Sequence, residues 1–127
     1  WQLLYLGGPT CDEACQQRLY FLRQLHTRLA KDTDRVQRAY VLTGAEEVDA
    51  ATAMWLKEQQ PDLRVIHGDT ATASAVLKRT ATTDPLAGHY IYVMDPVGNI
   101  MLYFTPDHDA AAILKDLKKL LASSGLG

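Results

Sequence analysis

Cys11 and Cys15 are the residues of this chain best suited to chemistry, and they are its only two cysteines. On a helix, residues four apart share a face, with Cβ atoms about 5–6 Å from each other. Two sulfurs at that separation can form a disulfide after a small local adjustment, or both can bind one metal ion. A helix N-terminus stabilises thiolate over thiol, and the thiolate is both the nucleophile and the metal ligand.

The alternative is a structural disulfide, or two ordinary buried thiols. A structural bridge stabilises a fold mainly by closing a long loop, and the loop between Cys11 and Cys15 is very short. The spacing therefore favours chemistry over a purely structural bridge.

A strand and a helix must position this pair. The apolar run 3–6 predicts a short buried strand, which Gly7, Gly8 and Pro9 end. Thr10 is the expected N-cap of a helix whose apolar face is spaced at Leu19, Leu22, Leu25 and Leu29. Both cysteines would then lie in the first turns of a helix that follows the carboxyl end of a strand. In open α/β sheets, ligands bind at that edge.

The rest of the chain alternates strand and helix signals in the order β-α-β-α-β-α-β-β-α. The alternation predicts parallel pairing in the first part. Asp95 to Asn99 reads D-P-V-G-N and predicts a hairpin turn, hence an antiparallel pair at the end. Further strands are expected at 35–43, 63–68, 89–94 and 100–104, and further helices from Glu46 to about Pro61, from Asp69 or Thr70 to Leu77, and from 106–109 onward.

The composition is that of one ordinary globular domain over residues 1–127. The net charge of −2 gives no indication of a nucleic-acid groove or a polybasic membrane patch. No apolar run approaches the roughly 20 residues that a membrane span needs. Because the chain starts at Trp1, directly on an apolar strand, we expect that a leader or membrane anchor precedes it.

With these motifs in place, the chain resembles the thioredoxin-like superfamily, and within it the Sco/SenC group of copper-handling cytochrome oxidase assembly proteins. The resemblance rests on three segments: L-L-Y-L-G-G-P-T-C-D-E-A-C, D-R-V-Q-R-A-Y-V-L and H-Y-I-Y-V-M-D-P-V-G-N-I-M-L-Y-F. Thioredoxins carry two residues between their cysteines, so the gap of three favours the Sco side. The resemblance implies a thioredoxin-like α/β fold, with a central mixed β-sheet flanked by helices on both faces.

In the Sco/SenC family, both motif cysteines and one distant histidine hold copper. Cys11 and Cys15 match the pair, and these would also be the redox-active residues. Counted back from Asp95, the family's histidine would fall near Ala87, and His89 lies two positions further on. A shift of two residues along an extended strand keeps the same face, so His89 is the expected third ligand.

Other polar residues are weaker candidates for metal ligands. His67, at the end of a strand, is the next histidine to consider as a ligand, whereas His26 and His108 are expected on the surface. Asp12 and Glu13 suit the start of a helix better than they suit a metal. Two thiolates and one imidazole form a soft site suited to Cu(I) and able to take Cu(II).

Two functions stay open, with a third possibility beside them. The first is a copper-binding assembly factor that delivers copper to the copper-centre subunit of cytochrome c oxidase. The second is a thiol-disulfide oxidoreductase that reduces a partner protein's disulfide: the more exposed Cys11 attacks as thiolate to form a mixed disulfide, and Cys15 resolves it. The third is an interaction domain with inert cysteines. The resemblance implies a periplasmic or other extracytoplasmic location, with membrane attachment only through the expected anchor.

Overall fold

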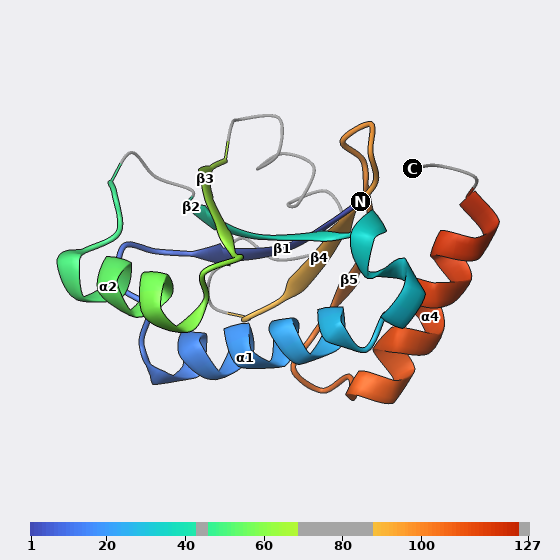
Figure 1. Cartoon of the computed structure of the whole chain (residues 1–127), viewed down its shortest axis with the longest axis horizontal. Helices are drawn as coiled ribbons and strands as arrows, with labels where there is room; N and C mark the ends of the chain where they lie inside the picture. Colours follow the sequence, from blue (N-terminus) through green and yellow to red (C-terminus); the bar gives the residue numbers. More distant parts are fainter. Residues whose placement is uncertain (43–45, 69–87, 125–127) are drawn as a thin grey trace.

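A computed structural model describes residues 1–42, 46–68 and 88–124 and contains a five-stranded mixed sheet. The strand order is β3-β2-β1-β4-β5, so β1 is the central strand (Figure 1). The predicted mixed sheet is confirmed. The elements are β1 (Gln2–Gly7), α1 (Glu13–Thr27), the 3-10 helix η1 (Ala30–Arg35), β2 (Gln37–Leu42), α2 (Ala50–Gln59), β3 (Arg64–His67), β4 (Ile91–Met94), β5 (Ile100–Phe104) and α4 (Ala110–Ser124).

Strand directions follow the predicted pattern. β1 pairs in parallel with β2, and β2 in parallel with β3. β4 runs antiparallel to both β1 and β5, and the turn at 95–99 joins β4 to β5. The carboxyl end of β1 leads into the loop that carries Cys11 and then into α1, which carries Cys15.

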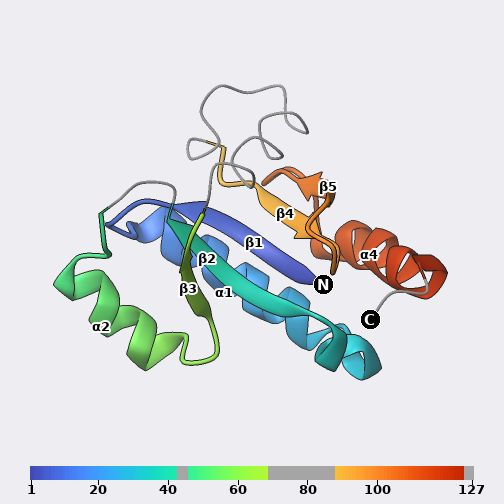
Figure 2. The ribbon, with the colours of Figure 1, turned by 90° about the horizontal axis from the view of Figure 1, so that it is seen from above.

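Helices α1, α2 and α4 all lie on one face of the sheet (Figure 1), and the view from above shows α1 running beneath the strands (Figure 2). The leucines predicted for the inner face of α1 are buried against inward side chains of the strands, such as Leu3 and Tyr5. The opposite face carries a second apolar cluster of Leu4, Leu6, Ala39, Val41 and Tyr92. The predicted helix after Asp69 lies outside the described residues, so the expectation of helices on both faces stays a prediction.

Helix starts are where the sequence predictions were least accurate. α2 begins at Ala50 rather than at Glu46, because the Asp49 carboxylate accepts a hydrogen bond from the Thr52 amide and fixes the cap there. α4 begins at Ala110, after Asp109 caps it through the amide of Ala112. Within 1–42, 46–68 and 88–124, no helix combines the length and apolar character needed to cross a membrane.

Candidate functional site

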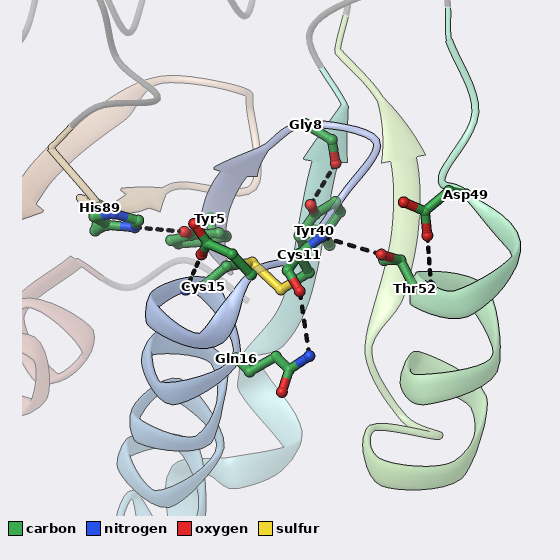
Figure 3. The surroundings of a disulfide bond; sticks show 10 residues. Tyr5, Gly8, Cys11, Cys15, Gln16, Tyr40, Asp49, Thr52 and His89 are labelled. Carbon is green, nitrogen blue, oxygen red and sulfur yellow. Dashed lines mark hydrogen bonds between the residues drawn. A yellow bond between two sulfur atoms is a disulfide. The ribbon is translucent and has the colours of Figure 1, made fainter.

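Cys11 and Cys15 are joined by a disulfide at the carboxyl end of β1, with Cα atoms 5.2 Å apart (Figure 3). Both cysteines are buried, each with 5% of its surface exposed. The expectation that Cys11 is the more exposed of the two is therefore wrong. In this oxidised state neither sulfur is a thiolate, so nucleophilic or metal-binding chemistry first requires reduction.

The helix that carries Cys15 starts later than predicted. Asp12, not Thr10, is the N-cap of α1, and its carboxylate accepts a hydrogen bond of 2.9 Å from the Cys15 amide. Thr10 instead donates its hydroxyl to Asp49, at 2.5 Å. Only Cys15 therefore lies in the first turn of α1, and Cys11 precedes the helix. The short segment between them turns enough for the sulfurs to meet without a shared helical face.

Helix α2 holds Cys11 in place. The Thr52 hydroxyl accepts a hydrogen bond of 3.0 Å from the Cys11 amide, and Thr52 is itself buried. The Asp49 amide donates to the Pro9 carbonyl, at 2.9 Å. The hydrogen bond from Thr10, together with those from Thr52, lowers the pKa of the Asp49 carboxyl. The hydrogen bonds that join Asp49 and Thr52 to the cysteine loop were not predicted. Their only local signal in the sequence was an aspartate three residues before a threonine.

Tyr40 on β2 supports the loop from the sheet side. Its hydroxyl donates to the Gly8 carbonyl at 2.5 Å, and burial raises its pKa to about 12. A Cβ atom on Gly7 would lie 2.3 Å from atoms of the Tyr40 ring. Glycine at position 7 therefore permits this close approach of strand and ring.

His89 lies in a turn, not on β4 as predicted, and its backbone has a φ of +50°. Its carbonyl accepts a hydrogen bond of 2.9 Å from Nε of Arg18, and its Nδ1 bonds the Tyr5 hydroxyl at 2.8 Å. Burial, and secondarily the nearby Tyr40 and Asp12, raise the pKa of Tyr5 well above its ordinary value, so this hydroxyl stays protonated. His89 therefore does not lie on an extended strand, as was predicted, although the turn still brings it to the site.

Cys15 and His89 border the same hollow, of about 140 Å³, together with Tyr5 and Asp12. His89 and Tyr5 flank Cys15, while Thr52 flanks Cys11 on the other side of the disulfide (Figure 3). In the described part of the chain, no three side chains of the histidine, cysteine, aspartate or glutamate type already form a metal site. The geometry therefore places two of the three predicted ligands, Cys15 and His89, around one space.

The remaining histidines are engaged elsewhere. His67 is exposed on β3, with Nε2 2.8 Å from Oε1 of Glu47, and β2 separates its strand from β1. His26 was expected to be solvated, but it is half-buried, with Nε2 2.7 Å from the Val36 carbonyl oxygen. His108 is exposed, as predicted.

Comparisons with solved structures give the same fold. Copper-bound yeast Sco1 is 17% identical with a TM-score of 0.69, and the match covers 96% of this chain and 78% of that one. Copper-bound Bradyrhizobium japonicum ScoI is 22% identical with a TM-score of 0.61, over 93% and 83% of the two chains. A putative thioredoxin from Neisseria meningitidis is 12% identical with a TM-score of 0.62, over 98% and 76%. A comparison with curated sequences found no match.

These likenesses confirm the predicted thioredoxin-like fold and the resemblance to Sco proteins. Residues 1–124 also match the family described as "Transmembrane-like, thioredoxin-like, C-terminal domain". Since that match spans nearly the whole sequence, the chain belongs to this family of thioredoxin-like domains.

Proposed function

We propose that this protein is a Sco-like factor whose Cys11–Cys15 disulfide opens on reduction to hold one Cu(I) ion, with His89 as third ligand. The proposal rests on one observation. Cys11 and Cys15 form a disulfide, and Cys15 borders the same hollow as His89. Reduction adds two electrons and two protons to the disulfide. Copper would then replace the thiol protons, so its affinity would fall as the pH drops.

The donor set suits this role. Thiolates are soft ligands that select Cu(I), and imidazole is compatible with copper in either oxidation state. Asp12 caps α1 through the Cys15 amide, so the helix start lies directly at the cysteine. The positive end of the helix dipole favours the thiolate that copper requires.

The structural relatives support the proposal. Yeast Sco1, Arabidopsis thaliana ScoI and Bradyrhizobium japonicum ScoI were each solved with copper bound. Within the proposal, the recipient of copper is the copper-centre subunit of cytochrome c oxidase or another protein with cysteines. The site of action is the periplasm or another extracytoplasmic face.

A second candidate function is thiol-disulfide exchange without metal. It is favoured by the engagement of His89 Nδ1 with Tyr5, and by the position of Cys11 outside the hollow that Cys15 and His89 share. In this reaction one cysteine thiolate of the reduced protein attacks a partner's disulfide and releases one partner thiolate. The second cysteine then breaks the mixed disulfide, which leaves the Cys11–Cys15 bridge and a fully reduced partner.

Competition for Cu(I) against a chelator of moderate affinity separates the two functions. The reduced wild-type protein is expected to retain one copper, and the oxidised protein none. Cys11→Ser and Cys15→Ser should each abolish retention, since each removes one of two thiolates.

His89→Asn is the appropriate variant for the third ligand, because asparagine tolerates a positive φ better than most residues. It should weaken copper retention while leaving disulfide formation intact, and His67→Asn, at a histidine on β3, is the matched control. If reduced wild-type protein gives up all copper to the chelator yet reduces a disulfide substrate, the second function replaces the first.

A further inference from the structure

A second hollow, of about 330 Å³, lies against α1 on the other side of His89. Its lining includes Arg18 and Phe21 of α1, His89, and His108 from the segment before α4. Among the described residues no carboxylate lines it, although Asp and Glu outnumber Lys and Arg in the sequence, 15 to 13. The hollow therefore brings together the side chains of Arg18, His89 and His108, and no acidic side chain of the described lining accepts a hydrogen bond from them.

Arg18 is the central group of this hollow, and only 9% of its surface is exposed. Its Nε donates to the His89 carbonyl, and its guanidinium lies 4.7 Å from the centre of the Phe21 ring. Its Nη2 has no hydrogen-bond partner within the described ranges, but this nitrogen is buried and offers almost no surface to a ligand. Burial lowers the pKa of Arg18, but a guanidinium stays charged in proteins. A buried cation with an unused donor is costly unless an anion pairs with it.

The two histidines can add donors. The Thr105 amide donates to Nδ1 of His108, at 3.1 Å, so a neutral His108 ring carries its proton on Nε2. His89 uses Nδ1 for Tyr5, which leaves Nε2 as its remaining ring nitrogen. Asp109 is close in sequence, but its carboxylate caps α4 through the Ala112 amide and does not line the hollow.

We propose that this hollow binds a carboxylate group, with Arg18 as the charged partner and His89 and His108 as flanking donors. The positive charge of the guanidinium matches the negative charge of a carboxylate. Among the described lining residues, Arg18 is the only permanently charged side chain, so it balances one carboxylate group, whereas a phosphate dianion carries both charges on a single group. The second carboxylate of a diacid such as succinate can remain in solvent. The carboxylate could belong to a small organic acid or to an acidic side chain of a partner protein.

The test is a titration of the oxidised, metal-free protein, followed by amide NMR, with succinate and its neutral analogue succinamide. Because no copper or free thiol is involved, the result is independent of the proposed function. Succinate should shift the amide signals of residues 14–18, 89, 105, 107 and 108 to saturation, and succinamide should not. Arg18→Gln should weaken binding about tenfold or more, since it removes a hydrogen bond from a charged donor. Arg28→Gln, at an exposed arginine just after α1, is the matched control.

Arg18 also donates a hydrogen bond to the His89 carbonyl, so Arg18→Gln can disturb the fold as well as the hollow. A second variant separates these two effects. His108→Ala, at an exposed residue, should weaken succinate binding about threefold. A blocked peptide with a central glutamate identifies the source: tighter binding than succinate indicates a partner's side chain, and equal or weaker binding indicates a small acid. The proposal is overturned if succinate causes no saturable shift, if succinamide binds equally well, if inorganic phosphate binds more tightly, or if both Arg18→Gln and His108→Ala bind like wild type.

Discussion

At the scale of single residues, Gly7 shows how closely the cysteine loop packs on the sheet. A Cβ atom at position 7 would meet the Tyr40 ring at 2.3 Å, whereas a Cβ on Gly8 would meet nothing within 4 Å. The Tyr40 ring is fully buried and cannot swing away into solvent. The two adjacent glycines therefore make a matched pair for testing this contact.

Gly7→Ala should lower the free energy of unfolding by about 1–3 kcal/mol, the usual cost of overpacking a close contact. Gly8→Ala should change it by less than about 1 kcal/mol. Urea denaturation followed by circular dichroism measures both. Equal effects of the two substitutions would show that the Tyr40 contact does not limit position 7.

The sequence was sufficient to identify the cysteines but not the surroundings of the third predicted ligand. Two cysteines four apart after a strand are a local signal. The left-handed backbone of His89 and its hydrogen bond to Tyr5 depend on contacts 84 residues apart in sequence, which no local pattern encodes. Arg18 was missed for the same reason, because its burial follows from the position of the His89 turn.

At the scale of elements, the hairpin between β4 and β5 depends on one carboxylate. Asp95 is buried, and its Oδ1 accepts hydrogen bonds from the amides of Val97 (3.0 Å) and Asn99 (2.8 Å). Burial raises the pKa of Asp95, but the hydrogen bonds from Asn99 and Val97 outweigh it and leave the pKa below the ordinary value. The unfolded chain therefore takes up a proton at higher pH than the folded chain does.

The lowered pKa of Asp95 determines how the free energy of unfolding changes with pH. The stabilisation from Asp95 is fully present above the ordinary carboxyl pKa and is lost as the pH falls toward the lower folded value. Asp95→Asn keeps an acceptor oxygen but cannot titrate, so it should lower stability at neutral pH by about 1 kcal/mol and flatten the loss on acidification. Urea denaturation from pH 7 to pH 3 measures this. If the free energy of unfolding of Asp95→Asn falls with pH in parallel with that of the wild type, this pH effect does not come from Asp95.

Among the described elements, apolar periodicity predicted the five strands and helices α1, α2 and α4, and the alternation with the turn at 95–99 predicted the parallel and antiparallel pairs. The 3-10 helix η1 was not predicted, because its segment carries mostly polar residues. Helix starts were less predictable, because several polar residues competed for each cap. At α1, Thr10 and Asp12 were both suitable, and the outcome depended on Asp49, which engages Thr10 from a different helix. At α2, Asp49 is the cap rather than a residue nearer Glu46.

At the scale of the whole molecule, copper binding requires that the fold survive without the disulfide. The bridge joins residues only four apart, and the chain-entropy relation gives about 2 kcal/mol for so short a loop. Cys11 and Cys15 belong to the larger apolar cluster, but the sheet and the other members of both clusters remain in place without the bridge. Reduction should therefore lower the free energy of unfolding by about 2 kcal/mol and leave a folded protein with an unchanged urea m-value. A reduced protein that has lost its native circular dichroism signal in the absence of urea would show that the bridge is structural.

The most direct measurement of the central claim is X-ray absorption at the copper edge of the reduced protein loaded with one Cu(I). The account predicts a copper ion with two sulfur ligands and one histidine nitrogen, and loss of the histidine contribution in His89→Asn. A spectrum that fits sulfur ligands alone, and that is identical in the wild type and His89→Asn, would contradict it.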